Sequence, residues 1–394
     1  MKVPSRILPV IVFAQFCCTS LWFAGNAVMN DLLLEFNLNS EALGHLTSAV
    51  QFGFISGTLS FAFLTISDRF SPSKVFFLCA LLGALFNLGI LVENNTLVSL
   101  IIFRFLTGFS LAGIYPVGMK IAADYYDKGL GRSLGYLVGA LVLGTAFPHL
   151  LKVFSGYIDL QWRSVIIFTS ILAAIGGILI VLLVPDGPYR SKRTKPDLKL
   201  AFKVFKNSNF RAAAFGYFGH MWELYAFWAF VPIILNFYKQ FHPEANFSIS
   251  LISFLIIGSG GLACVAGGYI SEKFGTKNTA SSALLLSGIC CLLSPFIFYF
   301  NSEILLIAFF IFWGLVVVAD SPLFSTLVAQ NASANSRGTA LTIVNCIGFT
   351  ITIFSIQLLN FLNGLLSPAL IFIFLALGPI FGLAALFYRK RSLH

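Results

Sequence analysis

The one long polar run of this chain reads PDGPYRSKRTKPDLKLAFKVFKNSNFR, residues 185–211. It carries eight basic residues and two acids, whereas the sequence on either side is almost continuously apolar. The two flanking blocks are nearly equal in length, which indicates two halves, residues 1–184 and 212–394, joined by a basic linker. Apolar residues recur at helical spacing between residues 198 and 205, which suits either a short helix on an anionic membrane surface or a solvated connection.

The composition predicts an integral membrane protein. Of 394 residues, 58% are hydrophobic and 10% are charged, whereas soluble proteins average about 25% charged residues. The net charge of +10 would suit nucleic acid in a soluble protein, but the basic residues here lie in short connections between apolar segments. That is the positive-inside pattern, so we expect a bilayer and no nucleic acid as partner. All seven cysteines fall inside apolar segments, where we expect small hydrophobes and neither a metal site nor a cofactor.

The apolar segments are each long enough to cross a bilayer once, since about 20 residues suffice. We place twelve spans near residues 7–29, 46–65, 75–92, 97–119, 133–152, 163–184, 212–235, 248–267, 278–299, 304–327, 340–363 and 367–388. With the N-terminus inside, 21 of the 25 lysines and arginines fall on the cytoplasmic side. Lys152, Arg163 and Lys239 fall in outer loops and Arg104 within a span. This distribution favours an even number of crossings with both termini in the cytoplasm.

The two halves carry matching landmarks. Residues 57–71 correspond to residues 261–275, each with a glycine followed eleven residues later by an acid, a base and a phenylalanine. Residues 108–116 correspond to residues 314–322, and both segments begin with glycine and end with proline. The offsets of 204 and 206 residues are nearly the same. We therefore predict an internal duplication of six spans.

These features resemble the major facilitator superfamily of secondary transporters. The family's signature between its second and third helices combines a glycine, Asp-Arg, a second glycine and further bases. The first copy here has Asp68, Arg69 and Lys74, with Ser71 at the glycine position, and the second copy has Glu272 at the position of the acid. The resemblance implies an all-α monomer with two pseudo-symmetric six-helix halves, which moves a small solute by rocking about a midplane site.

Two further family signatures concern the fourth and fifth spans. Arg104 is followed by Gly108 and Gly113, which resembles the arginine–glycine signature of the fourth span. Gly144 and Pro148 match part of a glycine–proline signature that the family associates with antiporters. Export of an amphipathic compound and uptake of a small solute therefore both stay open.

Three acidic or basic residues fall deep within the predicted spans, apart from histidines: Arg104, Glu223 and Asp320. A charge deep in a bilayer is costly, so each is a functional candidate. In the superfamily, spans one, four, seven and ten line the central cavity, and these three residues lie on spans four, seven and ten. We predict that Glu223 and, after it, Asp320 carry coupling protons, because burial favours the neutral form of a carboxyl group. Pro322 follows Asp320 closely and predicts a kink there.

Span seven reads YFGHMWELY over residues 217–225. His220 precedes Glu223 by three residues, which places both on one helix face, so His220 is a third candidate proton carrier. A hydrogen bond from His220 to a neighbouring helix is the alternative. Arg104 has two interpretations as well: it binds an anionic group of the substrate, or it neutralises a carboxylate, which would weaken that carboxylate as a proton carrier.

Polar and aromatic residues complete the predicted substrate site, since amphipathic rings suit a small organic solute. Packing or interface anchoring is the alternative for any single one. The predicted substrate-binding residues are Arg104, Trp22, Asn26, Gln51, Tyr115, Trp222 and Asn345. The family resemblance further implies charged latches between the halves, which break as the cytoplasmic gate opens. The residues of these latches would be Asp68, Arg69, Glu272 and Lys273.

We therefore predict a proton-coupled secondary transporter of a bacterial inner membrane. Acids outnumber bases by two to one in the spans, which favours a cationic or neutral substrate. A uniporter and the uptake of an anionic solute through Arg104 are alternatives, and a membrane sensor or scaffold without transport is an alternative from another class. A membrane enzyme is disfavoured because no nucleophile with a base is recognisable.

Overall fold

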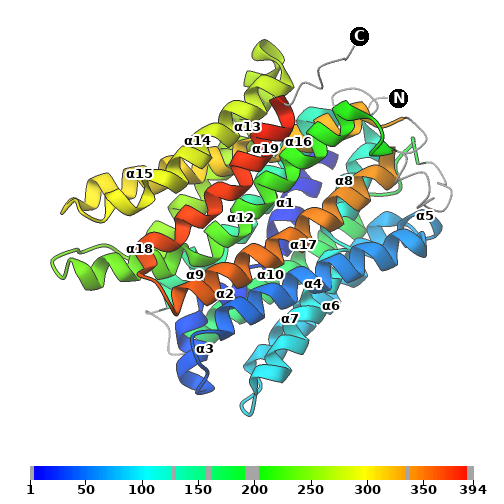
Figure 1. The fold of residues 1–394 in the computed structure, drawn as a ribbon. Coiled ribbons are helices and arrows are strands. Elements are labelled where there is room, and N and C mark those ends of the chain that lie inside the picture. Colours follow the sequence, from blue (N-terminus) through cyan, green and yellow to red (C-terminus); the bar gives the residue numbers. More distant parts are fainter. Residues whose placement is uncertain (1–3, 127–129, 156–160, 191–203, 334–336, 388–394) are drawn as a thin grey trace, which may run out of the picture.

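The computed structural model describes residues 4–126, 130–155, 161–190, 204–333 and 337–387. In these ranges every regular element is a helix, as Figure 1 shows. Eleven of the described helical segments are long and apolar enough to cross a membrane, and Ile7–Thr19 is a shorter apolar helix. The predicted all-α class is confirmed, and the predicted count of twelve membrane helices is consistent with these segments.

The first half contains a broken first span and several short turns of helix. Its elements are α1 (Ile7–Thr19), α2 (Ala24–Ala27), α3 (Met29–Glu35), α4 (Ala42–Phe63), α5 (Ile66–Arg69), α6 (Pro72–Leu88), the 3-10 turn η1 (Gly89–Leu91), α7 (Leu97–Leu111), α8 (Tyr115–Tyr125), α9 (Leu130–Ser155) and α10 (Gln161–Leu183).

The second half repeats this plan with a longer first helix. Its elements are α12 (Ser208–Phe241), α13 (Ile249–Phe274), α14 (Thr276–Ile297), α15 (Glu303–Ala319), α16 (Ser321–Asn331), α17 (Arg337–Asn363), α18 (Pro368–Ile371), the 3-10 turn η2 (Phe372–Ala376) and α19 (Leu377–Phe387). Most of the predicted linker helix, residues 198–205, lies outside the described residues.

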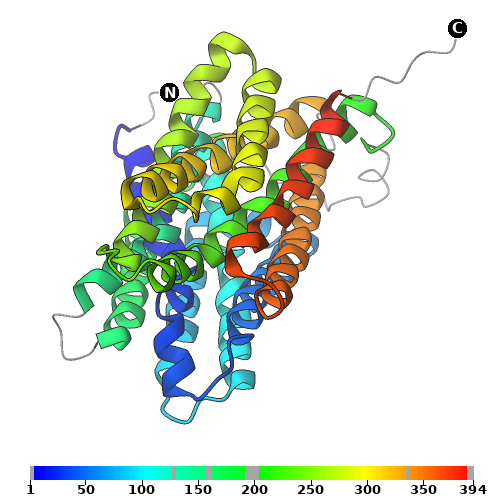
Figure 2. The same ribbon diagram turned by 60° about the vertical axis from the view of Figure 1, so that its left-hand side comes forward.

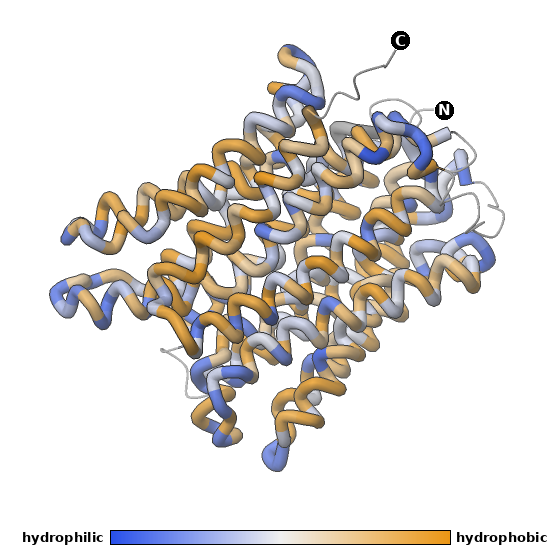
Figure 3. Tube along the Cα trace, viewed as in Figure 1, coloured by the Kyte–Doolittle hydropathy of each residue, from blue (hydrophilic) through white to orange (hydrophobic). Residues whose placement is uncertain are grey.

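The bundle has two ends. We call the end where α10 finishes and α12 begins the linker end; α1 also starts there and α19 finishes there (Figures 1 and 2). The other is called the opposite end. Figure 3 shows hydrophobic residues along the middle of the helices and hydrophilic residues gathered at both ends. This banding is the pattern of a bundle that crosses a hydrocarbon layer.

Three basic side chains expected in outer loops lie within helices instead, so that part of the prediction is wrong. Lys152 is in α9, Arg163 in α10 and Lys239 in α12, each in the helix turns nearest the opposite end. Lys152 Nζ lies 2.8 Å from both carboxylate oxygens of Asp31, and Arg163 pairs with Glu35. Both acids belong to α3, so these ion pairs hold α3 against α9 and α10. The paired lysine and arginine lie in the turns of α9 and α10 at the opposite end.

The duplication is visible in where the helices break. α7 gives way to α8 just before Pro116, and α15 gives way to α16 just before Pro322. Proline lacks the amide hydrogen that would continue the helix, which explains both breaks and confirms the kink predicted at Asp320. Moving the bounds of α7 and α8 by 206 residues gives 303–317 and 321–331, nearly the bounds of α15 and α16.

The turn after α13 explains why one copy of the loop signature keeps its glycine. Gly275 alone separates α13 from α14, and its φ of +84° lies in the region that disfavours a side chain. At the equivalent Ser71, φ is −57°, which any residue adopts. The first copy therefore has no conformational need for glycine there.

The two halves meet along two pairs of helices. α9 packs on α13, where a Cβ on Gly139 would lie 3.0 Å from the carbonyl oxygen of Gly261. α4 packs on α17, where Gln357 donates to Ser48 Oγ at 2.9 Å and Asn360 donates to the carbonyl oxygen of Glu41 at 3.2 Å. The second pair of contacts lies toward the opposite end.

Candidate membrane transport site

Arg104 holds the break in the first span. α1 ends at Thr19 and α2 begins at Ala24, and the guanidinium of Arg104, from α7, reaches the connection between them. Its Nη1 donates to the carbonyl oxygen of Leu21 at 3.1 Å, and its Nη2 donates to that of Trp22. Nη1 also lies 3.4 Å from Asn87 Oδ1 on α6. The Arg104 side chain is 1% exposed and water cannot stabilise its charge. The two backbone carbonyl groups and the amide of Asn87 provide this stabilisation instead.

Glu223 lies inside the second half. It is on α12, near the middle of the helix, and its side chain is 1% exposed. Ser287 on α14 donates its hydroxyl to Oε2 at 2.8 Å, and Trp313 on α15 donates its indole N–H to Oε1 at 2.6 Å. Each carboxyl oxygen thus has a neutral donor. A carboxyl group in this setting can keep its hydrogen-bonded position in either protonation state.

His220 and Asp320 form a second buried group. His220 Nδ1 lies 2.8 Å from Asp320 Oδ1, and both side chains are 1% exposed. Asp320 occupies the break between α15 and α16, while His220 lies one turn before Glu223 on α12. Nε2 and Oδ2 of the pair have no hydrogen-bond partner among the described residues.

His220 and Glu223 were predicted to share one helix face. In the structure they belong to two separate groups of side chains. Residues three apart on a helix differ by about 60° around its axis. That difference turns Glu223 toward α14 and α15 and His220 toward the α15–α16 break. Among the described residues, Arg104 forms no ion pair with either acid, and its guanidinium donates to carbonyl oxygens of the first span.

Aromatic rings from the two halves pack against one another. Trp22, in the broken first span, stacks on Phe349 of α17 with centroids 5.7 Å apart and lies 5.7 Å from Tyr225 of α12. Phe54 of α4 lies 4.5 Å from Phe349, and Tyr225 lies 5.3 Å from Trp228. We call these five residues the aromatic layer. It brings Trp22 and Trp228, which correspond at the repeat offset of 206, into one cluster.

Two tryptophans of this layer and two glutamines of the first half have buried polar atoms that lack a hydrogen-bond partner among the described residues. A buried polar atom without a partner costs free energy, so such a cluster calls for an explanation. A bound solute or water would supply the missing bonds. These atoms are Nε1 of Trp22, Nε1 of Trp228, Nε2 and Oε1 of Gln51, and Nε2 and Oε1 of Gln15.

The other predicted substrate-binding residues have mixed surroundings. Asn26 donates to Thr47 Oγ1 at 2.8 Å, and Trp222 donates its indole N–H to the carbonyl oxygen of Phe374 at 3.1 Å, so both bond within their own half. Tyr115 and Asn345 are half-buried. Their part in binding stays a prediction.

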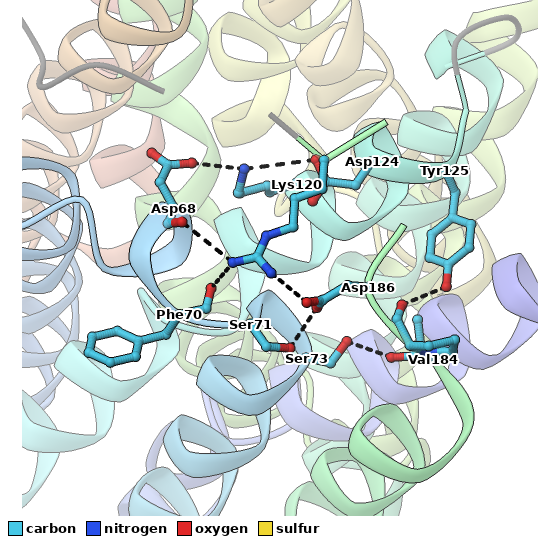
Figure 4. Close-up of polar contacts among 11 residues, drawn as sticks. Asp68, Phe70, Ser71, Ser73, Lys120, Asp124, Tyr125, Val184 and Asp186 are labelled. Carbon is cyan, nitrogen blue, oxygen red and sulfur yellow. Dashed lines mark hydrogen bonds and ion pairs between the residues drawn. The ribbon is translucent and has the colours of Figure 1, made fainter. Parts of the chain in front are cut away.

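The predicted latch residues lie at the linker end, and within the described part of the chain they form no ion pair between the halves. Asp68 pairs with Lys120 of α8 at 2.9 Å, within the first half, and Lys120 lies 3.8 Å from Asp124 (Figure 4). Arg69 and Glu272 are exposed. Lys273 places its ammonium 5.4 Å from the ring centroid of Phe274. A latch that has opened would have this arrangement.

The first residues of the linker fold back onto this cluster. Ser71 donates to Asp186 Oδ1 at 2.6 Å, and Tyr125 donates its hydroxyl to the carbonyl oxygen of Pro185 (Figure 4). Arg190 pairs with Asp186 and donates to the carbonyl oxygen of Phe70 at 2.8 Å. These bonds tie the linker to the loop between α5 and α6.

Sequence reasoning missed Ser287, Trp313, Lys120 and Arg190. The two partners of Glu223 are 64 and 90 residues away from it along the chain. No motif marks either one. Lys120 had a local signal, since it precedes Asp124 by one helical turn and an acid and a base at that spacing often pair.

Comparison with known proteins identifies the relatives of this chain. The family description "Major Facilitator Superfamily" matches residues 11–356 and, in a second alignment, residues 215–393. The sialic acid transporter NanX of Escherichia coli is 28% identical over 203 residues, which cover 48% of this chain and 47% of that protein. The benzoate transport protein of Acinetobacter baylyi is 26% identical over 321 residues, covering 70% of this chain and 66% of that one. The chain thus spans about half of the first relative and about two thirds of the second.

Solved structures share the fold. A bacterial homologue of the human lysosomal transporter Spinster, in an inward-facing and occupied conformation, aligns with a TM-score of 0.71 at 15% identity and covers 98% of this chain and 97% of that one. A variant of the nucleoside transporter NupG aligns with a TM-score of 0.73 at 15% identity, with 97% and 99% covered. At this identity the likeness concerns the fold.

Proposed function

Because this chain belongs to the Major Facilitator Superfamily, we propose that it is a proton-coupled secondary transporter of a small organic solute that works by alternating access. The observation that carries the proposal is the set of unsatisfied buried polar atoms around the aromatic layer and the His220–Asp320 pair. They lie on elements from both halves, near the middle of the bundle. A midplane site between two repeats is where a rocking transporter binds its cargo.

The arrangement of the halves supports an inward-facing state, with the linker end cytoplasmic. The hydrogen bonds that join α4 to α17 lie toward the opposite end. Near the linker end, a Cβ built on Gly135 of α9 or Gly268 of α13 would meet no other atom within 4 Å, whereas Gly139 and Gly261 are in close contact. The two helices are therefore packed less closely at Gly135 and Gly268 than at Gly139 and Gly261, and the described latch residues form no ion pair between the halves.

We propose a ring-containing solute that is neutral or carries its charge away from Arg104. The five rings of the aromatic layer pack on one another between the halves, where a ring of the solute could insert, and the indole N–H groups of Trp22 and Trp228 have no acceptor among the described residues. Arg104 already donates to two backbone carbonyls, which argues against its use as the anchor for an anion. The relatives named for sialic acid and benzoate make both compounds the first candidates to assay.

Proton movement in liposomes tests the proposal. The purified protein is reconstituted with an internal pH dye, and benzoate, sialic acid, nucleosides and aromatic amines are added one at a time. We expect at least one compound to drive proton movement. If labelled compounds cross the membrane while the internal pH stays constant, proton coupling is refuted and the protein is a uniporter or uses another ion.

Trp228→Phe tests the substrate site in the same assay. The substitution keeps an aromatic ring and removes one unsatisfied N–H donor, so we expect the half-saturating concentration of substrate to rise about fivefold, as for one lost hydrogen bond. Trp162→Phe is the matched control, because Trp162 packs against Phe36 inside the first half. Equal effects of the two substitutions would contradict the placement of the site.

A further inference from the structure

A groove opens between α13, α14 and α15, on the outside of the second half. Figure 1 shows the ribbons of these three helices at one edge of the bundle. Its volume is about 560 Å³, within the range of about 300–1,000 Å³ of small-molecule sites. Its walls are mainly apolar and include Leu262, Ile270, Phe274, Leu286 and Val316. Leu262 is 70% exposed and Phe274 is 60% exposed, so the groove faces outward and not into the bundle.

The groove starts at the linker end and extends about halfway along the helices. At 1.5 Å per residue, its lining rises about 12 Å on α14, from Asn278 to Leu286, and about 18 Å on α13, from Leu262 to Phe274. A hydrocarbon core is about 30 Å thick, so the groove covers about half of it. Its polar lining residues, Asn278, Thr279 and Ser282, all lie at the linker end. The groove is thus apolar toward the middle of the membrane and polar at the level of the lipid headgroups.

Two lysines, Lys273 and Lys277, lie near the polar end of the groove. Lys273 lies in the last turn of α13, and its ammonium is 5.4 Å from the ring centroid of the groove-lining Phe274. Lys277 lies in the first turn of α14, beside Asn278, with its ammonium 5.3 Å from the ring of Phe387. Phe387 belongs to α19, which does not line the groove, so Lys273 is the cation that contacts the groove wall. Glu272 precedes it in the sequence.

We propose that this groove binds one anionic phospholipid, with an acyl chain between α13, α14 and α15 and the headgroup phosphate at Lys273. The apolar lining matches an acyl chain, and the position of the cations matches a phosphate at the membrane surface. The surrounding bilayer supplies the ligand, and no solute has to reach the groove. The site would remain if the transport proposal failed, because it depends only on the placement of the bundle in a membrane.

Native mass spectrometry of the detergent-solubilised protein, titrated with dioleoyl phosphatidylglycerol or dioleoyl phosphatidylcholine, tests the site. We expect the wild type to bind the anionic lipid about fivefold more tightly, as for one Lys near a charged surface. Lys273→Gln should remove this preference, because it should weaken phosphatidylglycerol binding more than binding of phosphatidylcholine, whose choline ammonium already offsets its phosphate. Lys74→Gln, which removes an exposed cation at the linker end of the first half, should keep it.

Filling the groove tests the acyl chain. Ala266 lines the groove and is exposed, so Ala266→Trp should weaken the binding of both lipids, whereas Leu293→Trp, at an exposed position of α14 outside the groove, should not. Ala266→Leu is a smaller substitution for use if the tryptophan variant does not fold. Equal binding of the two lipids by the wild type would overturn the proposal. So would equal effects of the two tryptophan variants, or dimers that disappear in Ala266→Trp, which would make the groove an interface between copies.

Discussion

Glu223→Gln is expected to abolish substrate-driven proton movement while the protein remains folded. The amide can replace the carboxyl group without leaving a buried atom unsatisfied. Its oxygen can accept the indole N–H of Trp313, and its NH₂ can donate to Ser287, whose hydroxyl then donates to the carbonyl oxygen of Leu284, 3.1 Å away. The change thus removes a titratable proton and little else. The liposome assay with an internal pH dye measures the loss.

The control for this variant is Glu303→Gln. Glu303 begins α15, the helix that carries Trp313, and its Oε1 accepts the backbone N–H of Asn246 at the opposite end. We expect this control to transport like the wild type. If Glu223→Gln still moves protons with substrate, the coupling role passes to the His220–Asp320 pair, and Asp320→Asn becomes the decisive variant.

Much of the architecture was predictable because a membrane imposes long apolar segments and sorts cations to one side. The apolar segments gave the count of spans and that sorting supported an even number. Pro322 predicted the break in span ten, and the structure has a related break in span four at the matching Pro116. The break in the first span was not predicted. No proline lies between Thr19 and Ala24, and the apolar pattern runs through without interruption. What holds the break is a side chain from α7, which local sequence cannot reveal.

The sequence predicted which charged residues belong to the candidate site, but not which residues they contact. The cost of burying charge identified Glu223, Asp320 and Arg104, and all three are buried in the structure. Which groups compensate them depends on tertiary contacts. His220 could bond to Asp320 only once the α15–α16 break had placed that carboxylate beside α12. Helical spacing alone placed His220 and Glu223 on one face, but it could not show that the two side chains have different neighbours.

Arg104→Ala is expected to destabilise the protein strongly and to impair transport of every substrate. Without the guanidinium, the carbonyl oxygens of Leu21 and Trp22 lose a charged donor in a buried setting. Losing such bonds costs about 1–3 kcal/mol each, so we expect a loss of about 3 kcal/mol or more. Trp22 would also lose its fixed place in the aromatic layer. Thermal unfolding in detergent measures the first effect and uptake into liposomes the second.

Arg104→Lys separates support of the first span from binding of an anion. A lysine keeps the charge but cannot span two carbonyls with a planar fork, so we expect an intermediate loss of stability and an equal loss of uptake for charged and neutral compounds. Arg163→Ala is the control, because Arg163 forms a partly exposed pair with Glu35, which is worth about 0–1 kcal/mol. If Arg104→Lys keeps wild-type stability and loses only anionic substrates, Arg104 is a substrate ligand and the anionic-uptake alternative is correct. A joint loss of stability and of all transport would instead show that one buried cation positions the broken span on which the substrate site is built.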